Sequence, residues 1–128
     1  MTGPRLAQPI GLSLRPAIAR RQVEELLRRE RWPGDIDEIV LALHEALVNA
    51  QRHAGGVRRA EATVDRSSVV IQIWDRGPGF DPTPFVRRAP PAMAEHGRGL
   101  WLISQLTSAC EVRREDEGTA VVLRFDRP

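Results

Sequence analysis

The sequence predicts an α+β fold, in which helices pack against a sheet. Apolar residues recur at helical spacing in two long segments, the first beginning at Pro16 and the second covering residues 35–54. Two pairs of strand-like segments follow, and each pair is joined by a short polar turn of the kind that links antiparallel strands. A further helical segment over 100–107 separates the two pairs.

Length and composition indicate one globular domain. The chain has 128 residues, of which 41% are hydrophobic and 28% charged, so it is expected to fold rather than remain disordered. The formal net charge is only +2, and every basic residue apart from histidine is arginine, interspersed with acidic residues. A direct nucleic-acid surface is therefore not expected, because such surfaces concentrate basic charge.

Other features indicate a cytoplasmic protein that does not contact a membrane. No apolar run approaches the ~20 residues that a membrane span needs, and Met1 to Arg5 show no signal-peptide pattern. Cys110 is the single cysteine, which excludes an internal disulfide and fits a reducing compartment. No activating motif surrounds it, so we expect a packed residue rather than a nucleophile.

The first part of the chain is expected to form a loose start, a strand and a helix. Residues 1–9 contain Pro and Gly, and a short strand over 10–14 is a candidate for a sheet edge. Pro16 suits the first turn of a helix, which residues 32–34 (Trp-Pro-Gly) end. The buried stripe of this helix consists of Ala19, Val23, Leu26 and Leu27.

The longest helix is predicted over residues 35–54. Asp35 with Glu38 three residues later forms a capping-box-like start, and Gly55-Gly56 ends the helix. The apolar arc is predicted to consist of Ile36, Val40, Leu43, Leu47 and Ala50, widened by Leu41 and Val48.

Three polar residues interrupt this apolar helix. Glu45, Asn49 and His53 are each four residues apart, so they stack on one side. An unpaired buried polar group costs about 1–3 kcal/mol, so the protein or a ligand must supply partners. Carboxylate and carboxamide oxygens are ligands that Mg²⁺ prefers, together with waters and phosphates. A solvated polar strip is the alternative for Glu45 and Asn49, and a packed side chain is the alternative for His53.

The second half of the chain is predicted to form strands, a long loop, a helix and a hairpin. The more apolar of the first two strands is expected at the centre of the sheet. The loop is rich in proline, and loops of that length are usually functional or disordered. The predicted elements are strands 60–65 and 69–74, loop 80–95, helix 100–107, and strands 110–114 and 119–125 with a turn at 115–118.

Two glycine-containing segments have ligand-binding features. Asp75 ends the central strand and precedes Gly77 and Gly79. Its carboxylate can accept a hydrogen bond from an exocyclic amine such as adenine N6, and the glycines let a flat base approach the backbone. Residues 97–99 (Gly-Arg-Gly) open a helix, where free N–H groups and the helix dipole suit a phosphate. Each segment alone also fits a plain turn, but their order along the chain favours a joint site.

The order of these motifs resembles the nucleotide-binding domain shared by gyrase, heat-shock chaperones, histidine kinases and mismatch-repair ATPases, the histidine kinase-like (GHKL) superfamily. Residues 45–54 resemble its N box, 75–79 its first glycine box and 97–100 its second, and Gly118-Thr119 resembles the final strand motif that supports adenine. Within the superfamily, the short chain and its Glu-Ala-x-x-Asn-Ala-x-x-His-Ala segment are most similar to bacterial anti-sigma factor serine/threonine kinases. The likeness covers roughly residues 10–126.

The resemblance implies a fold and a set of site residues. The fold is a two-layer α/β sandwich of the Bergerat type over one domain, 1–128, with a mixed, mainly antiparallel sheet covered on one face by three helices. Residues 80–96 would form the ATP lid. Asn49 would hold Mg²⁺ at the phosphates, Glu45 would be the catalytic base, and Asp75 would recognise adenine. The other cofactor-binding positions implied are His53, Gly77, Gly79, His96, Gly97, Arg98, Gly99, Leu100 and Thr119.

The function implied is that of an ATP-dependent serine/threonine kinase in bacterial transcription regulation. It would bind a sigma factor and phosphorylate a small anti-anti-sigma (STAS-type) protein, and whether it forms a homodimer is left open. The alternative is a nucleotide-gated binding module of the same fold without phosphotransfer. A scaffold with an inactive pocket is a third class, which the intact motifs disfavour. His44-Glu45 also resembles the start of a phosphoacceptor box, but its Arg-Thr-Pro continuation is absent, so His44 is expected to be structural.

Overall fold

The computed structural model describes residues 8–53, 55–78 and 98–128. These residues form five strands and three helices, and the fold class predicted from the sequence is confirmed. In chain order the elements are β1 (Ile10–Gly11), α1 (Pro16–Arg29), α2 (Ile36–His53), β2 (Val57–Val64), β3 (Ser68–Asp75), α4 (Arg98–Leu106), β4 (Ala109–Glu115) and β5 (Gly118–Asp126). The predicted lid, 80–96, and most of the predicted loose start, residues 1–7, lie outside the described residues.

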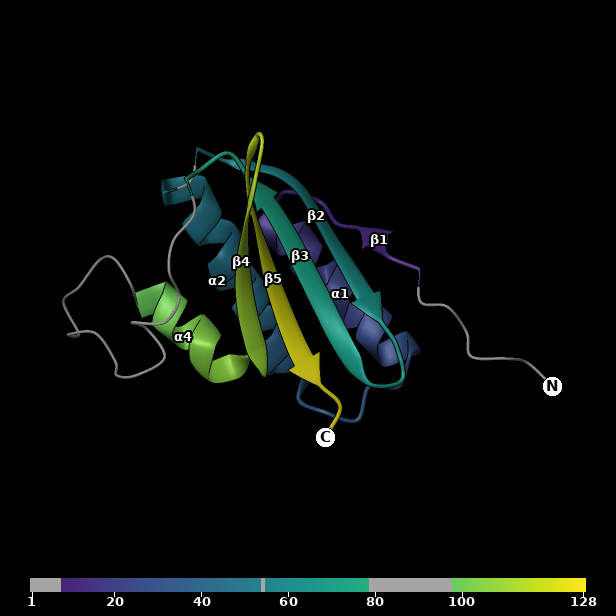
Figure 1. Cartoon of the computed structure of the whole chain (residues 1–128). Helices are drawn as coiled ribbons and strands as arrows, with labels where there is room; N and C mark the ends of the chain where they lie inside the picture. The colour runs from purple at the N-terminus through teal and green to yellow at the C-terminus, as the bar shows by residue number, and fades with distance from the viewer. Residues whose placement is uncertain (1–7, 54, 79–97) are drawn as a thin grey trace.

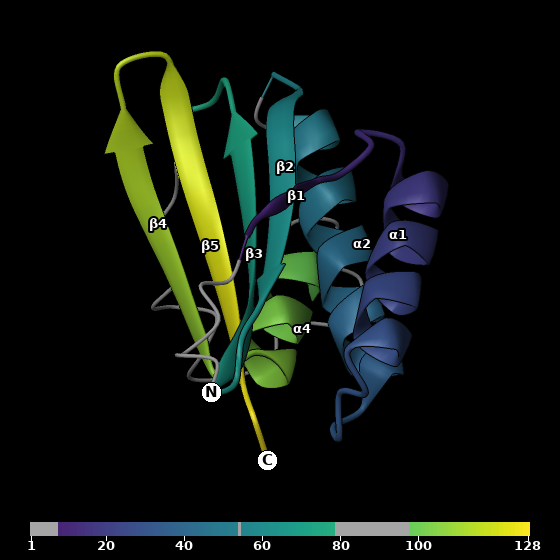
Figure 2. The same ribbon diagram turned by 90° about the vertical axis from the view of Figure 1, so that its right-hand side faces the viewer.

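The strands form one sheet in the order β1-β2-β3-β5-β4, with β3 at the centre as predicted. Each pairing between described strands is antiparallel, which corrects the expectation of a mixed sheet. The reason is the number of elements in each connection. Helices α1 and α2 run in opposite directions between β1 and β2, and α4 and β4 do the same between β3 and β5 (Figure 2). Each connection therefore returns the chain to the sheet in a strand that runs antiparallel to the one it pairs with.

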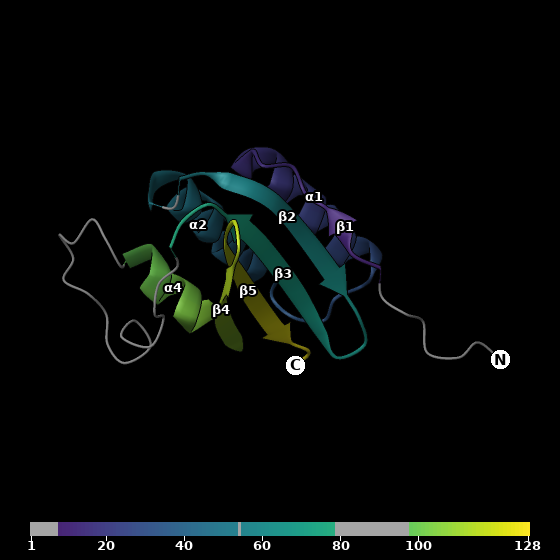
Figure 3. The ribbon, with the colours of Figure 1, turned by 45° about the horizontal axis from the view of Figure 1, so that its top comes forward.

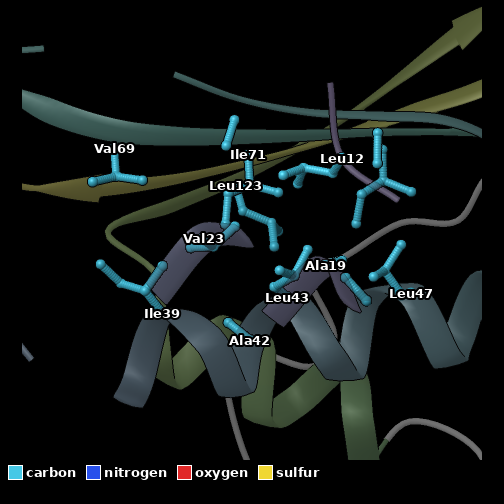
Figure 4. Close-up of a cluster of buried hydrophobic side chains, with 14 of the residues drawn as sticks. Leu12, Ala19, Val23, Ile39, Ala42, Leu43, Leu47, Val69, Ile71 and Leu123 are labelled. Atoms are coloured by element: carbon cyan, nitrogen blue, oxygen red, sulfur yellow. The ribbon is translucent and has the colours of Figure 1, made fainter. Parts of the chain in front are cut away.

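The helices form a second layer on one face of the sheet (Figures 1 and 2). Helix α2 lies in the middle of this layer and packs against both α1 and α4. Figure 4 shows Leu43 and Leu47 of α2 extending toward Ile71 and Leu123 in the sheet. All four side chains are fully buried, so the core lies between α2 and the central strands. Among the described residues, no helix combines the length and apolar character needed to cross a bilayer.

Strand β1 is shorter than predicted. It covers two residues at the sheet edge rather than 10–14, although the Leu12 N–H adds one more bond to the Ala60 carbonyl at 2.8 Å. After that bond the chain turns, because the Ser13 N–H donates to Oε1 of Gln22 at 2.7 Å and Pro16 opens α1. All four residues of the predicted stripe on α1 are buried, as expected. The helix ends at Arg29, and Arg31 adopts a left-handed conformation (φ 53°) that lets the Trp32 N–H reach the Leu27 carbonyl.

Helix α2 confirms most of its predicted features and corrects one. Oδ1 of Asp35 accepts from the Glu38 N–H at 3.2 Å, so the predicted N-terminal cap is present. At the other end, Gly55 and Gly56 both have positive φ, as a chain reversal after a helix requires. Leu41, however, is 40% exposed and does not belong to the apolar arc. The arc is completed instead by Ile39, Ala42 and Ala46, which are buried.

The remaining boundaries differ from prediction by a few residues. Strand β2 begins at Val57, three residues earlier than predicted, and helix α4 ends at Leu106. The hairpin turn narrows to residues 116–117, because Glu115 and Gly118 pair within the strands. Cys110 packs against the core, and burial raises the pKa of its thiol to about 11, which supports a packed role rather than a nucleophilic one.

Candidate functional site

The end of β3 meets the start of β5 and the loop after α2 at one end of the molecule. Figure 3 brings this end forward and shows the β4–β5 hairpin beside the end of β3. Asp75 is the last residue of β3 and pairs in register with Thr119 of β5. The Arg76 N–H donates to the Gly56 carbonyl at 3.3 Å, which ties this point to the loop that follows α2. Two segments far away in the sequence, the loop after α2 and the start of β5, therefore hold the first glycine segment.

Asp75 and Thr119 are buried and fix the path of Gly77. Oδ1 of Asp75 accepts the Gly77 N–H at 2.8 Å, and Oγ1 of Thr119 donates to the Gly77 carbonyl at 2.7 Å. Both polar groups of the Gly77 backbone are thus satisfied by side chains of the predicted site. Sequence motifs predicted all three residues, and the structure brings them together.

Position 118 requires a glycine because β5 and the end of β3 approach each other closely there. It has φ 148°, and a β-carbon there would lie 1.9 Å from the backbone oxygen of Asp75. No neighbouring side chain could yield to relieve that overlap, because the atom belongs to the backbone. The absence of a side chain at this position is therefore what lets β5 begin directly against Asp75.

Opposing effects act on the pKa of the Asp75 carboxyl. Burial raises its pKa above the ordinary value, since desolvation disfavours the charged form. The Gly77 N–H and the positive charge of Arg58 act in the other direction and favour the carboxylate. Within the part of the chain that the structure describes, the carboxyl has one hydrogen bond, through Oδ1.

Glu45 lies on the side of α2 that faces α4. A β-carbon at Gly99 would stand 3.0 Å from Oε2 of Glu45, so this carboxylate lies against the first turn of α4. Asn49 is half-buried, one helical turn from Glu45 on the same side of α2. Glu45 of the N box and Gly99 of the second glycine segment, far apart in the sequence, thus meet at the α2–α4 contact.

The other predicted positions are placed only in part. Leu100 is in α4 and packs against the core. His53 is the last residue of α2 and Arg98 the first of α4, and the structure describes their backbone only. Gly79, His96 and Gly97 lie outside the described residues.

His44, which the sequence suggested is structural, is half-buried on α2. Its Nδ1 is buried and has no hydrogen-bond partner within the described segments.

An open pocket of about 620 Å³ lies beside the site. Its lining consists of Arg76, Gly77, Pro78, Arg114, Glu115, Asp116, Glu117 and Gly118. Arg114 also donates from Nε to the Pro78 carbonyl at 3.2 Å. The lining includes neither Asp75 nor any residue of α2, so this pocket is on the hairpin side of the glycine segment and not between helix and sheet. Glu45, which the sequence predicted as the catalytic base, lies at the α2–α4 contact instead.

A comparison with protein families decides what these features have in common. The model of the histidine kinase-like ATPase domain matches residues 13–125, nearly the whole chain. The chain belongs to this histidine kinase-like ATPase family. None of the curated proteins searched matches it.

Membership of the histidine kinase-like ATPase family supports an ATP-binding regulatory function, and the site residues fit such a ligand. The buried Asp75 carboxyl is a polar group suited to a base amine, and Gly99 has no side chain that would crowd Glu45. Among the described residues, no cluster of three His, Cys, Asp or Glu side chains could hold a metal ion. Mg²⁺ bound with a nucleotide uses only one or two side chains plus phosphates, so Asn49, the predicted metal ligand, fits that mode of binding.

Sequence reasoning missed two arginines next to the site. Arg58 donates from Nε to the Asp75 carbonyl at 3.2 Å, and Arg114 bonds the Pro78 carbonyl. Neither belongs to a recognisable motif. Their contacts depend on how β2 and the hairpin are placed around Asp75, and no local pattern encodes that placement.

Proposed function

We propose that this protein is an ATP-dependent anti-sigma factor kinase that phosphorylates a serine of a small anti-anti-sigma protein in the cytoplasm. In this proposal it binds a sigma factor, and phosphorylation of the second partner controls that binding. The proposal goes beyond family membership, which supports ATP binding and regulation in general terms.

One observation carries the catalytic part of the proposal. The Glu45 carboxylate lies against the first turn of α4, where backbone N–H groups and the helix dipole favour phosphate. A carboxylate at the phosphate end of a nucleotide site can orient a hydroxyl for attack. In this proposal Asp75, at the end of β3, binds the base, and the two acidic groups serve opposite ends of one ligand.

Each residue then has a defined role. Asp75 accepts a hydrogen bond from the adenine amine, and Thr119 fixes the Gly77 backbone below the base. Asn49 holds Mg²⁺, which neutralises phosphate charge when bound. Glu45 orients the partner's serine hydroxyl and accepts its proton as the phosphoryl group moves from ATP to the serine oxygen and ADP leaves. Phosphoryl transfer depends mainly on positioning and charge neutralisation, which these residues supply.

The direct test is phosphotransfer from γ-labelled ATP with Mg²⁺ into a lysate of the source cells. We expect the wild type to label one small protein on serine. Asn49→Ala and Glu45→Gln should each remove the label, because the first loses the metal ligand and the second the base. Leu41→Ala is a matched control on the exposed side of α2 and should label as well as the wild type.

The same experiment separates the proposed kinase from the binding module. A wild-type preparation that binds ATP but labels no protein would contradict the kinase activity and favour a nucleotide-gated binding module. Labelling that persists in Asn49→Ala would exclude Asn49 as the metal ligand.

A further inference from the structure

Arg58 occupies an irregular position in β2, next to the site. The pairing of β2 with β3 skips it, since Val57 is opposite Asp75 and Arg59 is opposite Trp74. Such a bulge inserts one unpaired residue and redirects its side chain, and bulges are common next to functional sites. Arg58 is therefore free of the regular alternation that governs the rest of the strand.

The Arg58 side chain links three parts of the molecule. Its Nε donates to the backbone oxygen of Asp75 at 3.2 Å, and Nη1 donates to Oε2 of Glu117 at 3.3 Å. Nη2 lies 3.8 Å from Oε2 of Glu115. One guanidinium on β2 thus contacts the end of β3 and both acidic ends of the β4–β5 turn.

Two residues meet at the same carbonyl. The backbone oxygen of Asp75 accepts from Arg58, and Gly118 lies against it so closely that a β-carbon would overlap it. The hairpin and Arg58 therefore hold this carbonyl from two sides. A change at either point moves the residue whose carboxyl bonds Gly77.

These contacts contribute little as surface ion pairs. The Glu117 side chain is 81% exposed, and exposed ion pairs contribute about 0–1 kcal/mol. The Arg58 side chain is only 23% exposed, and its charge acts on Asp75 at the site. Neighbouring Arg59 makes a useful contrast, because it pairs with Glu61 and stacks 4.5 Å over Trp74, away from Asp75.

We propose that Arg58 is a positioning residue for nucleotide binding, which holds the end of β3 against the β4–β5 hairpin and so fixes the orientation of Asp75 without touching the nucleotide. This inference rests on the proposed function, because it assigns Asp75 to the adenine base. It adds a residue that lies outside every motif of the sequence.

The charged groups around Asp75 define the expected pH effect. Arg58 faces it from β2 and the Gly77 N–H from the following loop, while Glu115 and Glu117 of the hairpin pair with Arg58. Arg76, the next residue, is exposed. Removing the Arg58 charge takes away one of the two influences that oppose burial, so the pKa of Asp75 should rise further.

The test compares Arg58→Met and Arg58→Lys with Arg59→Met as the matched control. ATP affinity is measured by calorimetry across pH, and the Asp75 carboxyl is titrated by carbon-13 NMR without nucleotide. We expect Arg58→Met to weaken ATP binding about fivefold, the effect of one hydrogen bond of ordinary net strength. It should also move both the carboxyl titration and the acid limb of ATP affinity to higher pH.

The other variants separate charge from geometry. Arg58→Lys keeps the positive charge, so its Asp75 titration should stay near the wild-type midpoint while its affinity recovers only in part. Arg59→Met should match the wild type in both measurements. A merely structural role for Arg58 would weaken ATP binding equally at every pH and leave the Asp75 midpoint unchanged, and that result would overturn the inference.

Two further outcomes distinguish this inference from the proposed function. If the wild type binds ATP and Arg58→Met has the same affinity and pH profile, the inference alone is overturned. If the folded wild type binds no ATP, the proposed function fails and this inference fails with it.

Discussion

Asp75 is 4% exposed at the end of β3, and burial raises the pKa of its carboxyl. A buried carboxyl favours its neutral form in the folded state, so at neutral pH its ionisation opposes folding. The same ionised oxygen is what a base amine would bind. Stability and the proposed function therefore oppose each other at this residue.

Replacing Asp75 with Asn should stabilise the protein at neutral pH. The folded pKa lies above the unfolded value of 3.8, so the stability contributed by the neutral carboxyl is lost as pH rises between these two values. The amide oxygen of asparagine can still accept the Gly77 N–H. Because the amide does not ionise, the variant does not lose this stability as pH rises. Urea unfolding at pH 7 should show a higher midpoint for Asp75→Asn, with the gap closing below pH 3.8. A lower midpoint at pH 7 would contradict this account.

A second prediction at the residue scale concerns Gly118. Alanine there would place a β-carbon 1.9 Å from the Asp75 carbonyl, so the strands must separate. We expect Gly118→Ala to lower the free energy of unfolding by about 3 kcal/mol, the upper range for overpacked sites. Gly11→Ala is the control, since its β-carbon would meet nothing within 4 Å. Equal unfolding midpoints for the two variants would refute the required close approach.

At the element scale, α2 carries both the core and the site on different sides. Leu43 and Leu47 pack into the sheet, Glu45 faces α4, and Leu41 faces solvent. The core side fixes the rotation of the helix about its axis. Because that rotation is fixed, Glu45 is held against the first turn of α4 without a hydrogen bond of its own among the described contacts.

Two leucines on α2 test this arrangement. Leu43→Ala should cost about 2–5 kcal/mol because it leaves a cavity between helix and sheet. Leu41→Ala should change the free energy of unfolding by less than about 0.5 kcal/mol, since the side chain is exposed. Chemical denaturation of both variants measures the difference. Similar losses would mean that α2 is rotated relative to this structure.

Across the whole molecule, local sequence patterns predicted which helices and strands form better than they predicted where each one begins and ends. Helical spacing predicted α1 and α2 because an apolar stripe repeats whatever the helix packs against. It misplaced Leu41 because the pattern records which residues are apolar, while burial depends on where α1 and α4 lie. The direction of strand pairing depends on the number of elements in each connection, and the mixed sheet that the resemblance implied is antiparallel throughout the described strands.

In the candidate site, too, some residues could be predicted from local patterns and others could not. Asp75, Gly77 and Thr119 were predicted because each belongs to a short motif, and they meet in the structure. Arg58 was not predicted, because its partner Glu117 is 59 positions away and its place depends on a bulge. Motifs mark residues that touch a ligand, whereas the residues that position them are recognisable only in the folded chain.

The central claim is that an adenine nucleotide binds with its base at Asp75. The most direct test is calorimetric titration of the wild type and Asp75→Asn with ATP and with GTP, in the presence of Mg²⁺. The account predicts one ATP site in the wild type. GTP should bind about a hundredfold more weakly, since guanine presents an acceptor where adenine donates to the carboxylate. Asp75→Asn should lose that preference. A folded wild type that binds neither nucleotide, or both equally, would contradict the claim.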